Sequence, residues 1–270
     1  MTATEAPVLI EALANGVMTL TLNRPQRMNA FNVELHEALA AALERAKTSD
    51  ECRVVLLTGS GSGFCAGQDL SERIMAIQQG ERLDLGATIG KHYNPLVRTL
   101  RALPKPVIAA VNGVAAGAGA SIALACDIVL AARSARFIQA FARIGLIPDS
   151  GGTYFLPRLV GEARARAMML LADPINAEDA AAWGLVWRAV DDADLMGEAQ
   201  ATAQQLAAGP THAYGLMKRA FTASETNTLD AQLDLERDLQ REAGRKDEYR
   251  EGVQAFLEKR QAVFRKPASK

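Results

Sequence analysis

Short apolar runs that alternate with helical segments limit this chain to few folds. Most positions in these runs are apolar, as in strands buried on both faces, and none is long enough to cross a membrane. Amphipathic helical segments separate them, so the sequence predicts an α/β fold with parallel strand pairing. The runs are RVVLLTG (residues 53–59), PVIAAVNG (106–113), DIVLAARSARF (127–137) and LVWRAV (185–190).

The chain begins with a hairpin signal and ends in helices. Asn15-Gly16, between alternating apolar segments, is typical of a type I′ turn, and Asn32 is expected to cap the helix that follows. From about Leu195 the strand signal disappears and charged amphipathic helices follow. We therefore predict an α/β core over residues 1–195 and a helical oligomerisation region over 196–270. Further helices are expected over 96–103, 118–126, 151–172, 176–184, 231–244 and 249–264.

Composition excludes several classes of function. The net charge is −1 and acidic and basic residues are interspersed, so neither nucleic acid nor a membrane surface is an expected partner. The three cysteines have no metal-ligand spacing and give no disulfide framework, and no metal site is predicted. No signal peptide is recognised at the N-terminus, which favours a cytoplasmic location. The scattered histidines suggest no catalytic set, and His36 is expected at the surface or its boundary.

Two glycine-rich loops carry backbone groups that could bind a ligand. Gly61, Gly63 and Ala66 match a dinucleotide-binding pattern, but no acidic residue follows at the spacing needed for a ribose contact, so this reading is weak. Gly117 and Gly119 precede a helical run, whose first amide hydrogens lack partners and could stabilise an oxyanion. Alternatively, these glycines only allow helix and strand to pack closely.

A third stretch, GLIPDSGGT (residues 145–153), places Asp149 between an apolar run and a Gly-Gly pair. Proline, aspartate, serine and glycine all favour turns, so Asp149 could simply cap the next helix. A general base on a loop beside an apolar pocket is the other interpretation. Phe141, Ile144, Leu146 and Ile147 could then remove water from the carboxylate and strengthen it as a base.

Together these motifs resemble the crotonase superfamily, the enoyl-CoA hydratase/isomerase family. The resemblance runs through FCAGQDL (64–70), the stretch 105–128, the stretch 141–161 and EYREGVQAFLEKR (248–260). It implies a spiral of ββα units with C-terminal helices that build homotrimers or hexamers. It also implies an acyl-CoA thioester substrate, no separate cofactor, and an oxyanion hole formed by the backbone amides of Gln68 and Ala118.

The resemblance also bears on which reaction is possible. Hydratases of the family use two glutamates, and alignment places Ser121 and Phe141 at those positions, so hydration by that route is not expected. Asp149 falls where several isomerases and a dehalogenase of the family place a working aspartate. The implied activity is isomerisation of 1,2-epoxyphenylacetyl-CoA to its oxepin, or of a 3-enoyl-CoA to the 2-enoyl-CoA. A hydratase or fatty-acyl isomerase and a noncatalytic CoA-binding scaffold stay as alternatives.

The resemblance assigns CoA contacts to two parts of the chain. Arg27 is expected near the phosphates and adenine, although a solvated loop charge is an equal alternative. Phe256 and Lys259 are expected to reach CoA from a neighbouring subunit. The segment 71–94 is interpreted as a wall of the acyl pocket, with an amphipathic core helix as the competing view. The adenine end is expected to contact Ala66, Asp69 and Leu70.

Overall fold

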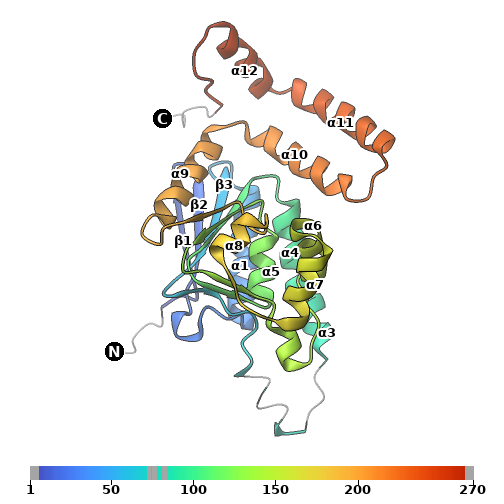
Figure 1. Cartoon of the computed structure of the whole chain (residues 1–270). Coiled ribbons are helices and arrows are strands. Elements are labelled where there is room, and N and C mark those ends of the chain that lie inside the picture. Colours follow the sequence, from blue (N-terminus) through green and yellow to red (C-terminus); the bar gives the residue numbers. More distant parts are fainter. Residues whose placement is uncertain (1–5, 72–73, 75–77, 81–83, 265–270) are drawn as a thin grey trace.

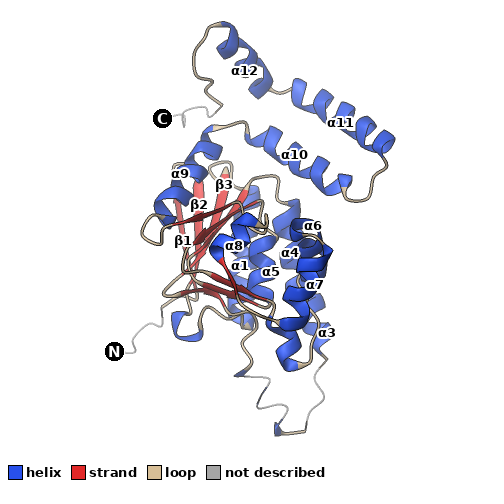
Figure 2. Ribbon diagram, in the orientation of Figure 1, coloured by secondary structure: helices blue, strands red, loops and turns tan. Residues whose placement is uncertain are grey.

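The main sheet of the computed structural model is the parallel sheet that the sequence predicts, with one antiparallel edge strand. The structure describes residues 6–71, 74, 78–80 and 84–264. Strands follow the order β1-β2-β3-β5-β7-β10, and every pair except β1-β2 is parallel. Figure 2 shows this sheet among the helices of the core. The strands are β1 (Leu9–Ala14), β2 (Val17–Leu22), β3 (Val54–Gly59), β5 (Val107–Val111), β7 (Ile128–Ala132) and β10 (Arg188–Val190).

The N-terminal hairpin is confirmed in detail. Strands β1 and β2 pair antiparallel, and Ala14 lies opposite Val17. Asn15 and Gly16 have φ angles of 53° and 85°, so both turn residues occupy the left-handed region that a type I′ turn requires. Asparagine and glycine adopt this region at the lowest cost, and for that reason the pair is a reliable local signal.

A second sheet was not visible in the sequence. It contains β4 (Gly63–Cys65), β6 (Val114–Ala116), β8 (Arg136–Ile138) and β9 (Ile175–Asn176), in that order. The prediction of one strand over 127–137 was wrong, because the chain turns after Ala132 and its two halves join different sheets. Strands of two or three residues carry no measurable periodicity, so sequence patterns could not separate them.

The helices of the core begin and end mostly where the local signals predict. The side chain of Asn32 accepts a hydrogen bond from the Leu35 amide and so caps the first helix, as predicted. The segment 151–172 forms two helices rather than one, because Gly161, with a φ of 77°, interrupts it. These helices are α1 (Val33–Thr48), α3 (Leu85–Thr88), α4 (Asn94–Ala102), α5 (Ala118–Leu124), α6 (Gly152–Val160), α7 (Glu162–Leu171) and α8 (Ala177–Ala182), with short turns η1 (Pro25–Arg27), η2 (Ile89–Tyr93) and η3 (Ala140–Ile144).

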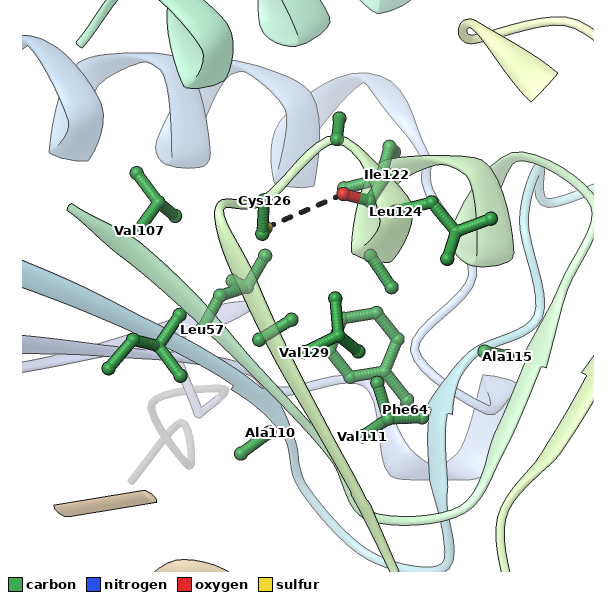
Figure 3. Packing of buried hydrophobic residues seen from close by; sticks show 14 of the residues in the cluster. Leu57, Phe64, Val107, Ala110, Val111, Ala115, Ile122, Leu124, Cys126 and Val129 are labelled. Carbon is green, nitrogen blue, oxygen red and sulfur yellow. Dashed lines mark hydrogen bonds between the residues drawn. The ribbon is translucent and has the colours of Figure 1, made fainter. Parts of the chain in front are cut away.

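One apolar core connects both sheets to the helices between them. Leu57, Val107 and Val129 belong to one buried cluster with Ile122 and Leu124 of α5 (Figure 3). Phe64 of β4 is completely buried in the same cluster, so it joins the second sheet to the first. Each fully buried side chain of this size contributes about 1.5–3 kcal/mol relative to an exposed one.

The C-terminal helices divide by their packing. Helix α9 (Leu195–Ala208) packs on the six-stranded sheet through Ala199, Ala203 and Ala207, which are buried. Helices α10 (Thr211–Ser224), α11 (Leu229–Gly244) and α12 (Asp247–Leu257) extend away from the sheets (Figure 1). The division at residue 195 stays a prediction. None of the helices in the described part of the chain is long and apolar enough to cross a membrane.

Candidate active site

The first glycine-rich loop leaves β4 and places Gln68 in an extended conformation beside Phe31. The Phe31 amide donates to the Gly67 carbonyl at 2.7 Å, and the Asp69 amide donates to the Phe31 carbonyl at 2.9 Å. The Gln68 N–H shares a trans peptide group with the Gly67 carbonyl and points in the opposite direction, so it faces away from Phe31. Within the described residues no acceptor takes this N–H, so it is available to a ligand.

Hydrogen bonds hold the Gln68 side chain in place. Its amide nitrogen donates to the Phe31 carbonyl at 3.0 Å, and its oxygen accepts from the Tyr93 hydroxyl at 3.0 Å. A cavity of about 380 Å³ opens next to it, between the start of α1 and residues 84–92. Part of the segment 71–94 therefore lines a cavity at Gln68, while Met75 and Ile77 lie outside the described residues.

The second glycine-rich loop lies directly against the first. A side chain at Gly67, whose φ is 89°, would bring its Cβ to 2.9 Å from the Ala116 carbonyl oxygen and 3.3 Å from the Ala118 nitrogen. Gly119 is equally constrained, because its Cβ would lie 2.3 Å from the Cys65 carbonyl oxygen. The glycines therefore have the close-packing role considered above, and this packing brings the peptide groups of Gln68 and Ala118 into one small region.

Ala118 is the first residue of α5, so its N–H has no partner within the helix. The preceding Gly117 has a φ of 52° and a ψ of −126°, and its own amide donates to the Ile138 carbonyl at 2.8 Å. No described residue accepts a hydrogen bond from the Ala118 amide. Two backbone donors, one from each loop, therefore have no acceptor among the described residues.

Asp149 lies half-buried on the turn that leads into α6. Its carbonyl accepts a hydrogen bond from the Gly152 amide at 2.8 Å, and its Oδ1 accepts one from the Ser150 hydroxyl at 2.9 Å. The residue at the cap of α6 is Gly151, so Asp149 does not occupy the capping position that one interpretation of the sequence suggested.

The backbone of this turn is strained where Asp149 is attached. Ser150 has a φ of 52°, which is uncommon for a residue with a side chain, and it is buried. Gly151 follows with a φ of 83°, and a Cβ there would lie 2.4 Å from the Phe155 ring. Strain of this kind costs of the order of 1–3 kcal/mol and is concentrated at functional sites. The glycine at position 151 is therefore required by the conformation that presents Asp149.

The two positions aligned with glutamates carry no acid. Ser121 is buried in α5, and Phe141 is buried with its ring 3.7 Å from the Cβ position of Gly117. The expected apolar surroundings of Asp149 are only partly present. In the single chain, Ile144 is 55% and Ile147 is 80% exposed, so neither removes water from the carboxylate. Gly145, with a φ of 70°, ends η3 between these two exposed residues.

Asp69 has a structural role that the sequence did not indicate. Its carboxylate accepts hydrogen bonds from the Ser71 amide and hydroxyl at 3.1 and 2.5 Å, and from Arg24 at 2.9 Å. Arg24 also donates to the Ala30 carbonyl at 2.5 Å. Burial raises the pKa of Asp69, but the bonds from Ser71 and Arg24 outweigh it and hold this pKa below its usual range. The Asp69 side chain is thus occupied, and its backbone amide and carbonyl also have partners, in the Phe31 carbonyl and the Gln68 side chain.

The other expected CoA contacts fall into two groups. Arg27, Ala66 and Leu70 are exposed at the outer edge of the loops that carry Asp69 and Gln68. Phe256 is 83% exposed on α12, and Lys259 follows that helix, so the single chain does not bring them to these loops (Figure 1). A contact from Phe256 or Lys259 requires the site of another subunit, as the sequence analysis proposed.

Several other polar groups are buried near the site. Cys65 lies below the first loop, and burial raises the pKa of its thiol to about 12, so it is not a reactive thiolate. His36 is only 5% exposed, against expectation, and stacks on Phe31. Gln139 is buried, and its oxygen lacks a partner among the described residues; no sequence signal pointed to it. No group of three potential metal ligands occurs in the part of the chain that is described.

Comparison with known proteins gives consistent results. The profile of the enoyl-CoA hydratase/isomerase family matches residues 12–267. The chain is 56% identical to the 1,2-epoxyphenylacetyl-CoA isomerase of Escherichia coli, over 95% of this chain and 97% of that protein. It is 35% identical to the trans-2-decenoyl-[acyl-carrier-protein] isomerase of Streptococcus mutans, over 93% of this chain and 95% of that protein.

Solved structures agree with this result. A crystal structure of an enoyl-CoA hydratase from Polaromonas sp. JS666 superposes with a TM-score of 0.87 at 35% identity. The match covers 95% of this chain and 99% of that chain, so it includes both sheets and the C-terminal helices.

Proposed function

The chain belongs to the enoyl-CoA hydratase/isomerase family, and from this premise we propose that it isomerises acyl-CoA thioesters, with Asp149 as the base. The observation that carries the proposal is the distribution of acids at the site. Asp149 stands on a strained turn, whereas the two positions that hold glutamates in hydratases carry Ser121 and Phe141. A single carboxylate is sufficient to move a proton between two carbons, but the two-glutamate route to hydration is unavailable.

The proposed reaction begins at C2 of the acyl group. Asp149 removes a proton from C2, and the Gln68 and Ala118 amides donate hydrogen bonds to the thioester oxygen as it becomes an enolate. One such donor contributes about 3–4 kcal/mol to transition-state stabilisation. With 1,2-epoxyphenylacetyl-CoA, the electron pair opens the epoxide, the ring expands to the oxepin, and Asp149 returns the proton taken from C2 to a carbon of the ring. With a 3-enoyl-CoA, the double bond moves into conjugation and Asp149 returns the proton to C4.

The CoA moiety is proposed to lie along the exposed edge of the two loops. Arg27 supplies a positive charge there, while Ala66 and Leu70 offer a surface beside the adenine. We further propose a homotrimer or hexamer, since Met217, Phe221 and Phe256 expose large apolar surfaces on the C-terminal helices. The reaction uses no cofactor other than the CoA of the substrate. A cytoplasmic location stays a prediction.

The test is proton exchange at C2. Purified protein is incubated with phenylacetyl-CoA or a 3-enoyl-CoA in D₂O, and deuterium at C2 is measured by mass spectrometry. We expect Asp149→Asn to keep its fold and its affinity for CoA thioesters but to lose exchange and turnover. Asp173→Asn, which removes an exposed carboxylate elsewhere, is the matched control and should behave as wild type. Near wild-type exchange in Asp149→Asn would refute the assignment of the base.

The same experiment separates the alternatives. A noncatalytic CoA-binding protein would bind both thioesters but exchange neither. A fatty-acyl isomerase would act on straight-chain 3-enoyl-CoAs and leave 1,2-epoxyphenylacetyl-CoA unchanged. A hydratase would add water to a 2-enoyl-CoA, which the Ser121 and Phe141 positions oppose.

A further inference from the structure

Two buried polar side chains next to the turn that carries Asp149 have no role in the proton transfer described above. Ser121 belongs to α5, one helical turn after Gly117, and Gln139 lies between β8 and η3. Their exposed fractions are 0% and 1%. Both residues therefore lie inside the protein, Ser121 in the helix that follows the second glycine-rich loop and Gln139 two residues before Phe141.

Neither side chain is well satisfied. The Gln139 oxygen receives no hydrogen bond from any residue that the structure describes. Among the described residues, the Ser121 hydroxyl makes one hydrogen bond, long at 3.4 Å, to the Gly117 carbonyl. A buried polar atom without a partner is destabilising, and native proteins contain few of them. An apolar residue at position 139 would avoid this cost, so the carboxamide points to a role other than stability.

The two groups converge on the start of α6. A Cβ built on Gly152 would lie 2.9 Å from Ser121 Oγ and 3.4 Å from Gln139 Oε1. It would also lie 3.1 Å from Cβ of Pro148, the residue before Asp149. The Gly152 amide itself bonds to the Asp149 carbonyl. Both side chains thus adjoin the short turn that presents the base.

Neither side chain of this pair carries a charge. Serine supplies one hydroxyl, which donates or accepts, and the glutamine carboxamide offers an acceptor oxygen and two N–H donors. Rotation of the carboxamide about its last bond can present either end. Phe141 limits the same region with an apolar ring against Gly117. Such a site suits an uncharged oxygen atom attached to an otherwise apolar group.

We propose that Ser121 and Gln139 form a polar subsite that binds an oxygen atom of the substrate's acyl group, such as the ring oxygen of an arene epoxide. This inference rests on the proposed function, because it places the acyl group next to Asp149. It also assigns specificity: a thioester without that oxygen leaves the buried polar groups unpaired, and polar sites discriminate strongly against such analogues.

The test compares binding of two thioesters that differ by one oxygen. Affinities for phenylacetyl-CoA and 2-hydroxyphenylacetyl-CoA are measured by calorimetry with wild type, Ser121→Ala and Gln139→Met. We expect wild type to bind the hydroxylated ligand about 10-fold more tightly, as one hydrogen bond of about 1.4 kcal/mol gives. Each variant should lose most of that preference and keep its affinity for phenylacetyl-CoA. Gln204→Met, at an exposed position on α9, controls for the replacement and should retain the preference.

Turnover and stability give two further measurements. With 1,2-epoxyphenylacetyl-CoA, kcat/KM of Gln139→Met should fall about 10-fold, while with a 3-enoyl-CoA it should stay within about 3-fold of wild type. The Tm of Gln139→Met should equal or exceed that of wild type, because an unpaired buried group is removed. A lower Tm, equal losses on both substrates, or no wild-type preference for the oxygenated ligand would overturn the subsite. If the proposed function is wrong and Asp149 is not the base, Asp149→Asn will instead show undiminished proton exchange at C2.

Discussion

Gly67→Ala is the most informative change to the proposed oxyanion hole, because it adds one methyl group at the contact between the two loops. Gly67 has a φ of 89°, where an L side chain is strained by roughly 1–2 kcal/mol. The new Cβ would lie 2.9 Å from the Ala116 carbonyl oxygen, closer than real Cβ contacts, so one of the two backbones must move. Neither atom belongs to a flexible side chain that could yield instead.

This movement acts directly on both proposed donors. The same Cβ lies 3.3 Å from the Ala118 nitrogen, and the Gln68 amide follows in the next peptide bond. If either N–H is displaced from the thioester oxygen, kcat should fall about 10²–10³-fold, as for loss of one oxyanion donor. Strain and overpacking together should lower the free energy of unfolding by about 2–5 kcal/mol.

Steady-state kinetics tests the predicted fall in kcat, and thermal unfolding tests the predicted loss of stability. Gly197→Ala is the matched control, because Gly197 lies on α9 with an ordinary φ and nothing near its Cβ position. Alanine favours the helix there by about 1 kcal/mol, so this variant should be slightly more stable and fully active. A wild-type kcat in folded Gly67→Ala would refute the assignment of these two amides.

Two further predictions concern groups around the site. The pKa of His36 is lowered to about 4 by burial and, second, by His92. Between pH 6.5 and 4 the unfolded chain therefore binds a proton that the folded chain does not, so the free energy of unfolding should fall by up to about 3 kcal/mol as pH drops. Urea titrations should show that this pH dependence is weaker in His36→Phe. A pH profile of His36→Phe equal to that of wild type would contradict the prediction. Arg24→Met leaves the Asp69 carboxylate without its cation and should cost about 1–3 kcal/mol and raise KM for acyl-CoA. The double variant with Asp69→Asn should recover part of both losses, and strict additivity in this cycle would exclude coupling.

Much of the scaffold could be predicted because its signals are local. Asn15-Gly16 fixes the hairpin through backbone angles that few other residues adopt, and Asn32 caps α1 with its own side chain. The strand at residues 54–59 is buried on both faces, as its apolar run indicates. The absence of an acid at Ser121 and Phe141 was also visible in the sequence, because the chemical type of a side chain is known before its location.

The sequence-based predictions failed where a feature depends on contacts between residues that are far apart in the sequence. The strands β4, β6, β8 and β9 have two or three residues each and exist only because they pair with one another. His36 lies beside an apolar stripe in the sequence. In the structure its ring stacks on Phe31 and lies edge-on to Tyr93, and these contacts help to bury it.

The sequence by itself predicted the α/β class, and the family resemblance added a lone aspartate where hydratases carry two glutamates. The sequence left the role of the glycines open between ligand binding and close packing. Only the tertiary structure decided that Asp69 is occupied by Arg24, from a loop 45 residues away. It alone revealed that Gln139 and Ser121 meet over Gly152. The physical reason is that conformational preferences act within a few residues, whereas burial and hydrogen-bond satisfaction depend on which distant segments pack together.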